Sequence, residues 1–454
     1  MKIVVLGGGP GGYSAALYAA KKNHTVLLIE KDKIGGTCLH RGCIPTKSFL
    51  NDSKIISNTF YAKESGLLEN VCQFNPEIIV QNKNKIVANL NQGLEKLILN
   101  HKIEIINDEA SFVDEHSIYL KNSNQTIQAD AFIIATGSIP KKLPFVELSD
   151  KIWTSDQCFD TVPNKTENII IIGGGVIGLE LATFYRQLQH NVTIIEAEKT
   201  CAPNFDSQAI SQLVGLLKKS GVTILTQAQV QSIDEHECVV ALKDSTTRLS
   251  FDHCIMAVGR KPNIDSLSLE KANIKSGFGI EINENYQTSQ PHIYAIGDVT
   301  GKSWLAHQAS AMAKAVISHL LDNQPVTLSS IPMVIYTTPE IAMVGKSLDS
   351  IKDNPDYRSV KVPLLGNGMH MISKHQRGFM SMIINKNDII EGATVFSNAA
   401  SEIIHTLSIA IDHKLSIHDL SSMVFAHPSL SEPISDLVNE PLHQALHSLY
   451  RNID

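Results

Sequence analysis

Residues 3–12 read Ile-Val-Val-Leu-Gly-Gly-Gly-Pro-Gly-Gly, which is an apolar strand that runs directly into a glycine-rich turn. A helix from about Tyr13 to Lys22 is expected next, and a strand from Thr25 to Glu30 would complete a strand–helix–strand unit. The glycine spacing is G-x-G-x-x-G, and the acidic residue lies 18 positions beyond the last glycine. This arrangement is typical of a Rossmann dinucleotide-binding fold.

The same pattern occurs again at residues 169–178, which read Ile-Ile-Ile-Ile-Gly-Gly-Gly-Val-Ile-Gly. A helix to about Leu188 and a strand from Asn191 to Glu196 would close this second unit. A single fingerprint of this kind is weak evidence. Two fingerprints, each between a strand and a helix and each with its acid, predict an α/β fold with two Rossmann-like dinucleotide-binding domains.

Each residue of the two fingerprints has a physical role. The first glycine permits the tight turn, the second lets the backbone approach a pyrophosphate, and the third lets helix and strand pack closely. The acid accepts hydrogen bonds from ribose hydroxyls, and the helix N-terminus faces the phosphates. The residues predicted to do this are Gly7, Gly9, Gly12 and Glu30 in the first unit, and Gly173, Gly175, Gly178 and Glu196 in the second.

The second acid also indicates which nicotinamide cofactor to expect. Glu196 would bind the ribose 2′-hydroxyl of NAD, whereas it would repel the 2′-phosphate of NADP, which requires an arginine. Arg186 lies on the preceding helix and not at that position. We therefore expect NAD rather than NADP.

Residues 35–47 read Gly-Gly-Thr-Cys-Leu-His-Arg-Gly-Cys-Ile-Pro-Thr-Lys and place two cysteines five positions apart. In an ideal helix the two Cα atoms would be roughly 8–9 Å apart, which is more than a disulfide spans comfortably. A bridge between Cys38 and Cys43 would need a distorted backbone, which Gly42 and Pro45 make easier. A strained disulfide is readily reduced, as a redox catalyst requires. The alternative is two unpaired cysteines near a helix start.

Length and composition narrow the class of protein. The 454 residues suggest about three domains. The net charge is −7 and acidic and basic residues are interspersed, so the charge pattern does not indicate nucleic-acid binding. The sequence contains no run of 18 apolar residues, so no membrane span is predicted. The opening strand is too short to be a signal peptide. Seven scattered cysteines do not form a secreted disulfide framework, so we expect a reducing cytoplasm. The cysteines expected to be reduced, mostly buried thiols are Cys72, Cys158, Cys201, Cys238 and Cys254.

Residues 35–47 resemble the redox-active motif of the class I flavoprotein disulfide reductases, the pyridine nucleotide-disulfide oxidoreductases. They are most similar to the version found in dihydrolipoamide dehydrogenases. The resemblance extends over essentially the whole chain. The strands that end at Thr136-Gly137 and at Gly259 are similar to those at the domain junctions of the family, and Gly297-Asp298 resembles its second flavin motif.

The resemblance implies a domain order. An FAD-binding domain with the redox disulfide would occupy residues 1–148, and an inserted NAD-binding domain residues 149–262. Residues 263–328 would return to the FAD domain, and residues 329–454 would form an α+β dimerisation domain. The family residues implied for FAD, beyond the first fingerprint, are Thr37, Lys47, Thr136, Gly137, Gly297 and Asp298, and Gly259 is implied for NAD.

The resemblance also implies catalytic residues. Residues 427–432 match the family element His-Pro-x-x-x-Glu, in which His427 is the acid/base that acts on the cysteines of the other subunit and Glu432 orients its imidazole. Lys47 and Glu180 would pair beside the flavin ring. Phe425 stands where dihydrolipoamide dehydrogenases usually carry a histidine, and it would change the lining of the substrate channel.

The implied activity is oxidation of protein-bound dihydrolipoyl groups through the Cys38–Cys43 disulfide and FAD, with reduction of NAD⁺. Cys38 would form the mixed disulfide and Cys43 the thiolate beside the flavin. The implied partners are a second copy of the chain and a lipoyl-bearing acyltransferase of a 2-oxoacid dehydrogenase complex, or a glycine cleavage lipoyl protein. No metal site is expected. The alternatives are an NAD(P)H-dependent reductase of another disulfide such as glutathione disulfide, a non-catalytic FAD-bearing docking subunit, and a simple flavin NADH oxidase.

Overall fold

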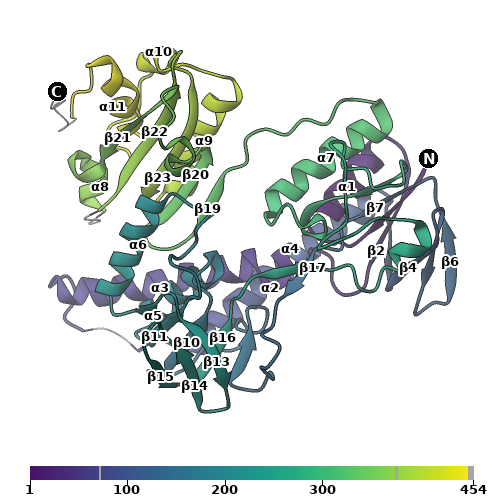
Figure 1. Cartoon of the computed structure of the whole chain (residues 1–454), viewed down its shortest axis with the longest axis horizontal. Coiled ribbons are helices and arrows are strands. Elements are labelled where there is room, and N and C mark those ends of the chain that lie inside the picture. Colours follow the sequence, from purple (N-terminus) through teal and green to yellow (C-terminus); the bar gives the residue numbers. More distant parts are fainter. Residues whose placement is uncertain (71–72, 374–376, 448–454) are drawn as a thin grey trace. The chain divides into compact units, whose positions relative to one another are not determined.

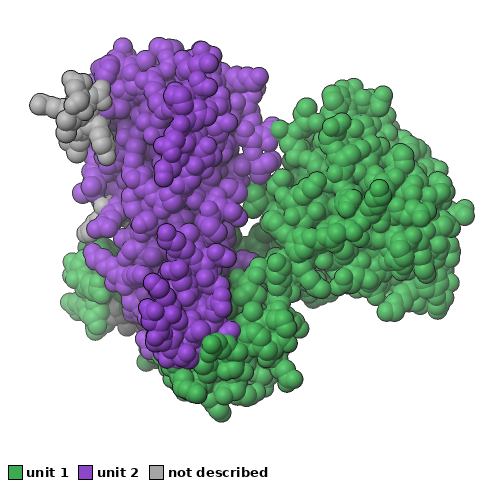
Figure 2. Space-filling view, in the orientation of Figure 1, with its two compact units in different colours: residues 1–173, 231–239, 248–328 green, residues 174–230, 240–247, 329–454 purple. Residues whose placement is uncertain are grey.

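The computed structural model describes residues 1–70, 73–373 and 377–447, so Cys72 lies outside the described residues (Figure 1). The chain divides into two compact units (Figure 2). The first comprises residues 1–173, 231–239 and 248–328, and the second comprises residues 174–230, 240–247 and the described residues from 329 on. The predicted bounds at 148, 262 and 328 stay predictions, because these units do not test them.

The first fingerprint folds as the predicted strand–helix–strand unit. Strand β1 (Lys2–Leu6) leads into helix α1 (Pro10–Lys21), and strand β2 (Thr25–Glu30) pairs with β1 in parallel. The helix begins three residues earlier than predicted, because proline is well suited to the first helical position. The parallel sheet has the order β18-β7-β1-β2-β3. Its remaining strands are β7 (Ala131–Ile134), β18 (Ile293–Ala295) and β3 (Glu104–Asn107).

The second fingerprint forms the corresponding unit. Strand β10 (Asn168–Ile172) is followed by helix α5 (Val176–Gln187) and strand β11 (Asn191–Ile195), so Glu196 is the first residue beyond its strand. The sheet order is β12-β11-β10-β16-β9. Its remaining strands are β12 (Thr223–Leu225), β16 (His253–Met256) and β9 (Ile152–Thr154). The described pairings β11–β12, β10–β16 and β16–β9 are all parallel, which is typical of dinucleotide-binding sheets.

Several elements have no counterpart in the prediction. Helices α3 (Cys43–Glu64) and α4 (Pro76–Asn100) are long and pack against each other. Helix α7 (Ala306–Asp322) packs against α1, and helix α6 (Ser207–Lys219) is capped by the Asp206 carboxylate. One small antiparallel sheet comprises β4 (Ala110–Asp114), β5 (Ser117–Leu120) and β6 (Gln125–Gln128). A second three-stranded sheet comprises β13 (Gln229–Ile233), β14 (Glu237–Ala241) and β15 (Thr246–Ser250). Within the described ranges, no helix is long and apolar enough to cross a membrane.

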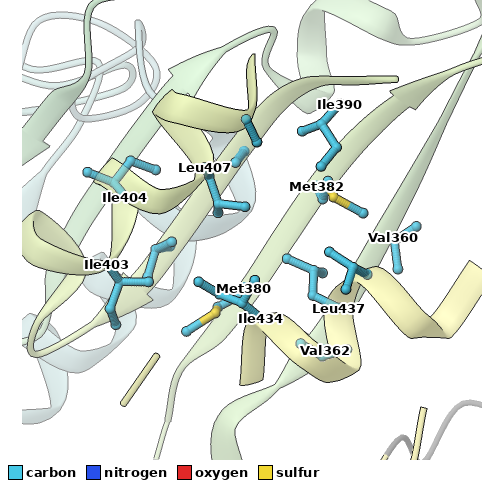
Figure 3. Close-up of a cluster of buried hydrophobic side chains, with 14 of the residues drawn as sticks. Val360, Val362, Met380, Met382, Ile390, Ile403, Ile404, Leu407, Ile434 and Leu437 are labelled. Atoms are coloured by element: carbon cyan, nitrogen blue, oxygen red, sulfur yellow. The ribbon is translucent and has the colours of Figure 1, made fainter. Parts of the chain in front are cut away.

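The C-terminal part is the predicted α+β domain. Its antiparallel sheet has the order β19-β20-β23-β22-β21, and helix α9 (Ala400–Asp412) packs against β20 and β23. Figure 3 shows the apolar core between these strands and helices. The strands are β19 (Met333–Ile335), β20 (Glu340–Gly345), β21 (Tyr357–Pro363), β22 (Phe379–Asn385) and β23 (Ile390–Ser397). The shorter helices are α8 (Gly368–Ile372), α10 (Ile417–Ser421) and α11 (Pro433–Asn439).

Substitution of a core residue of α9 tests this packing. Leu407 is fully buried in the core of Figure 3, so Leu407→Ala is expected to lower the free energy of unfolding of the domain by about 2–5 kcal/mol. Ile409 lies on the same helix with 59% of its surface exposed, so Ile409→Ala is the matched control and should cost no more than about 0.5 kcal/mol. Denaturant unfolding followed by circular dichroism measures both, and equal losses would contradict the described packing.

Candidate active site

The first glycine turn has the geometry that a dinucleotide requires. Gly7 has a φ of +101°, and a Cβ there would lie 2.4 Å from the carbonyl oxygen of Ala135. A Cβ on Gly12 would lie 1.7 Å from the oxygen of Gly7, so the close approach of helix to turn excludes any side chain. A Cβ on Gly9, in contrast, would meet only the Cα of Gly36, at an ordinary contact distance of 4.0 Å. The turn is therefore closed on the inside and accessible where a pyrophosphate would approach.

The acid at the end of β2 is held by the turn itself. Glu30 accepts the backbone N–H of Gly8 at 2.6 Å through Oε2 and that of Asp32 at 2.8 Å through Oε1. A carboxylate offers about four lone-pair sites, so these bonds orient Glu30 and leave acceptor capacity for a ribose. The pocket beside it is lined by Gly7, Glu30, Asp108, Thr136 and Asn263, among others. Residues of this chain thus fit an adenosine end of FAD.

The second turn repeats this geometry. Gly173 has a φ of +107°, and a Cβ there would lie 2.4 Å from the oxygen of Ala257. Glu196 accepts the N–H of Gly174 at 2.6 Å and that of Glu198 at 2.7 Å, as Glu30 does in the first turn. No described atom lies within 4 Å of the Cβ positions of Gly175 or Gly259, so both face open space. These residues fit a second dinucleotide.

The predicted backbone distortion between the two cysteines is present. Helix α2 (Gly36–Arg41) ends before Gly42, whose φ of −142° and ψ of −110° are not helical, and α3 then begins at Cys43. Pro45 does not contribute to the distortion, contrary to expectation. It lies in the first turn of α3, where a missing N–H costs no hydrogen bond.

Cys38 and Cys43 are both partly exposed, and they are hydrogen-bonded to each other. A hydrogen bond with Cys43 and burial raise the pKa of Cys38, whereas the charge of Lys47 lowers it. Two such thiols titrate as a coupled pair, so the second proton leaves much less readily than the first. Cys43 stands at the N-terminus of the 22-residue helix α3, where negative charge is favoured.

The cysteine segment is attached to the first glycine turn. The N–H of Gly35 donates to the oxygen of Gly8 at 2.8 Å, and the ring of His40 is hydrogen-bonded through Nε2 to the oxygen of Ile34 at 2.8 Å. Burial raises the pKa of Tyr13 on α1, and the nearby charges of Cys38 and Cys43 raise it further. The redox pair and the dinucleotide turn therefore form one local structure.

Asp298 and Thr136, two further residues predicted to bind the flavin, are each held by a hydrogen bond to a segment distant in sequence. Asp298, in the short helix η2 (Gly297–Thr300), accepts a hydrogen bond from the Ser138 hydroxyl at 2.6 Å. Burial raises the pKa of Asp298, and the bond from Ser138 and the charge of Arg260 lower it. Thr136 donates its hydroxyl to the oxygen of Asn263 at 2.8 Å, which joins the two predicted junction strands.

His427 and Glu432 form the predicted pair. Nδ1 of His427 lies 2.7 Å from Oε1 of Glu432, and this hydrogen bond is the main cause that lowers the pKa of Glu432. Asn367 donates to Oε2 of the same carboxylate at 3.3 Å. The His427 side chain is 76% exposed. With Nδ1 bonded to a carboxylate, Nε2 is the nitrogen that faces solvent and can exchange a proton.

The remaining predicted residues are placed as follows. Glu180 is buried, and its Oε1 accepts the N–H of Tyr336 at 2.9 Å. Its pairing with Lys47 stays a prediction, as does the contact of Thr37 with FAD. Phe425 packs against the buried core of the C-terminal sheet. Among the described residues, no group of three or more His, Cys, Asp or Glu side chains has the arrangement of a metal site.

Sequence reasoning missed three groups that the fold brings to these sites. Ser138 and Arg260 surround Asp298, and they come from strands more than a hundred residues apart. His447 bonds to Asp436 at 3.2 Å and lines the same pocket as His427. Ser138 and Arg260 follow the glycines of the two junction segments, but no local pattern indicates their contacts or those of His447, so only the fold shows them. The four described cysteines outside the pair, Cys158, Cys201, Cys238 and Cys254, are buried thiols, as predicted.

Comparison with known proteins identifies the class that these sites define. Residues 1–313 match the model of the pyridine nucleotide-disulphide oxidoreductase family, and residues 331–438 match the dimerisation domain of that family. The chain belongs to the pyridine nucleotide-disulphide oxidoreductase family, whose members are flavoprotein disulfide oxidoreductases.

Relatives of full length share this organisation. The chain is 36% identical to the dihydrolipoyl dehydrogenase of Buchnera aphidicola over 457 aligned positions, which cover 96% of this chain and 94% of that protein. It is 33% identical to the dihydrolipoyl dehydrogenase of Geobacillus stearothermophilus, with 98% and 97% covered. Two solved structures are similar over almost their whole length. LpdA from Mycobacterium tuberculosis has a TM-score of 0.89 at 26% identity, with 97% of this chain and 99% of that chain covered. The HOCl-induced flavoprotein disulfide reductase RclA from Escherichia coli has a TM-score of 0.86 at 25% identity, with 97% and 99% covered.

Alkylation of the native, reduced protein tests the thiol environments. Cys38 and Cys43 are partly exposed, whereas Cys201 and Cys238 are buried, and burial raises the pKa of each of these two thiols to about 11. We expect iodoacetamide at pH 8 to modify the Cys38–Cys43 pair at least about tenfold faster than these two buried thiols, as measured by peptide mass spectrometry. In guanidinium chloride the difference should disappear. Equal rates in the native protein would contradict the described burial.

Proposed function

We propose that this protein is a dihydrolipoyl dehydrogenase, which oxidises protein-bound dihydrolipoyl groups and reduces NAD⁺. The observation that carries the proposal is the Cys38–Cys43 pair on both sides of the break at Gly42, hydrogen-bonded to a dinucleotide turn through Gly35. Full-length relatives with the name dihydrolipoyl dehydrogenase support this substrate over other disulfides.

The chemistry of the cysteine pair begins from its oxidised form. A substrate thiol loses its proton to His427 of the partner subunit, and the resulting thiolate attacks Sγ of Cys38 and expels Cys43 as a thiolate. The second thiol of the substrate then attacks the substrate sulfur of the mixed disulfide, which closes the lipoyl ring and expels Cys38. Cys38 takes up the proton that this second thiol loses. Two electrons have passed from the dithiol to the cysteine pair. The Glu432 carboxylate stabilises the protonated imidazole during these steps.

The cofactors follow from the two glycine turns. We assign FAD to the first turn, with Glu30 and Asp298 as its carboxylates, and NAD to the second turn, with Glu196 as its ribose acid. The chemistry that FAD supplies when bound is transfer of the electron pair from the cysteines to the nicotinamide. Arg186 donates its guanidinium to the oxygens of Ser220 and His190, which supports NAD over NADP because this arginine is already engaged.

The proposed partners are a second copy of the chain and a lipoyl-bearing protein. The family dimerisation domain at residues 331–438 supports the homodimer. The exposed His427 suits a group that acts on the cysteines of another subunit. We also propose a cytoplasmic location, because the described cysteines outside the redox pair are buried and scattered along the chain rather than arranged as a disulfide framework.

The decisive assay is NADH formation from NAD⁺ and dihydrolipoamide. We expect rapid turnover with this pair, and little with glutathione disulfide plus NADH or NADPH. Cys38→Ser should abolish dithiol-dependent turnover while the purified protein keeps its flavin, because no mixed disulfide can form. Cys158→Ala, at a buried thiol away from the pair, is the matched control and should retain activity. Fast glutathione disulfide reduction with slow dihydrolipoamide turnover would assign the pair to another disulfide.

Nicotinamide recognition is tested at Glu196. Glu196→Gln removes the charge and one of the two acceptor oxygens, so it weakens the bond to the ribose and one bond from the turn. The KM for NAD⁺ should therefore rise by about tenfold. Glu198→Gln is the control, because that residue contributes its backbone N–H to Glu196. An unchanged KM for Glu196→Gln would remove Glu196 from the NAD site.

A further inference from the structure

Arg260 holds Ser138 with two hydrogen bonds. It begins strand β17 (Arg260–Pro262), which pairs in antiparallel fashion with β8 (Ser138–Pro140). Nε of Arg260 donates to the Ser138 hydroxyl oxygen at 2.8 Å, and Nη2 donates to the Ser138 carbonyl oxygen at 2.9 Å. The Arg260 side chain is only 14% exposed. The guanidinium fork therefore fixes both the backbone and the hydroxyl of one residue.

Ser138 passes this constraint to Asp298. Its hydroxyl accepts from Arg260 and donates to Oδ2 of Asp298 at 2.6 Å, so its hydrogen points toward the carboxylate. Ser138 is buried, which excludes water as a competing donor. The positive charge of Arg260 thus acts on Asp298 through a single oriented hydroxyl.

A carboxylate holds the other side of the guanidinium. Nη1 of Arg260 donates to Oδ1 of Asp156 at 2.9 Å, and Asp156 is 18% exposed. Oδ2 of the same carboxylate lies 3.9 Å from Nε of Arg41. Arg41 stands between the two redox cysteines in sequence and also bonds to Asp32 at 2.7 Å. One carboxylate therefore lies between a cation of the redox segment and the cation that holds Ser138.

We propose that Arg260 is a positioning residue of the flavin site, which acts through Ser138 to orient Asp298 and is itself held by Asp156 next to the redox segment. The inference rests on the proposed function, in which Asp298 binds the flavin. It deepens that function by assigning a role to three residues, Arg260, Ser138 and Asp156, that belong to none of the predicted sites. Arg260 touches neither the substrate nor the cysteines in this role, so its effect is on flavin retention.

A double-mutant cycle tests the inference. The rate of FAD release from the diluted holoenzyme, followed by flavin fluorescence, is measured for Arg260→Gln, Asp298→Asn and the double variant. We expect each single variant to release FAD about tenfold faster or more, and the double variant to release it little faster than Asp298→Asn alone, because Arg260 acts through that carboxylate. The inference is overturned if the fold-increases in FAD release of the two single variants multiply in the double variant. It is also overturned if either single variant releases FAD at the wild-type rate.

Further variants keep the test decisive. Asp265→Asn is the matched control, since Asp265 forms an exposed pair with Lys261, the neighbour of Arg260, at 3.1 Å and should leave FAD release unchanged. If Arg260→Gln does not fold, as judged by circular dichroism, then Ser138→Ala replaces it in the cycle with the same expectation. A wild-type protein that holds no FAD would reject the proposed function, whereas a wild-type flavoprotein with multiplied effects in the cycle would reject only the role of Arg260.

Discussion

The close approach of a glycine turn to the neighbouring strand is the constraint on which the site depends. At Gly7 the chain turns with positive φ against the carbonyl of Ala135, and no side chain fits there. This turn lets β1 lead directly into α1, whose N-terminus then faces the same space as Gly9. Because Gly35 bonds to the oxygen of Gly8, the same turn also anchors the redox segment. A single local geometry thus places phosphate recognition and thiol chemistry side by side.

The two dinucleotide turns hold their acidic residues, Glu30 and Glu196, in the same way. In each turn the carboxylate of the acid, Glu30 or Glu196, accepts two backbone N–H groups. One belongs to the glycine directly after the first fingerprint glycine, and the other belongs to the residue two positions beyond the acid. These bonds orient a negative charge before any ribose is bound, which lowers the entropy that binding would cost. The repeated geometry explains why one sequence pattern serves two nucleotides, although the surrounding residues differ.

The thiols of this chain fall into two environments. Cys38 and Cys43 are partly exposed at the junction of two helices. The hydrogen bond with Cys43 and burial raise the pKa of Cys38, and the charge of Lys47 lowers it. Cys158, Cys201, Cys238 and Cys254 are buried, and burial raises the pKa of each. Reactivity is therefore confined to one pair by position rather than by the chemistry of cysteine itself. The His427–Glu432 pair has the complementary design, with an exposed ring and a more buried carboxylate.

Both strand–helix–strand units and the distorted backbone near Gly42 could be predicted from the residues alone, because each is encoded within a few neighbouring positions. The α+β C-terminal domain was predicted from the family resemblance. The pairing of His427 with Glu432 was also predicted from that resemblance, and the structure contains this hydrogen bond. Only the folded structure shows that Pro45 lies in a regular helical turn. Only it joins Asp156 to Arg260, Arg260 to Ser138, and Ser138 to Asp298. Such contacts join strands that are distant in sequence, and no local pattern records which long-range pairs a folded chain brings together.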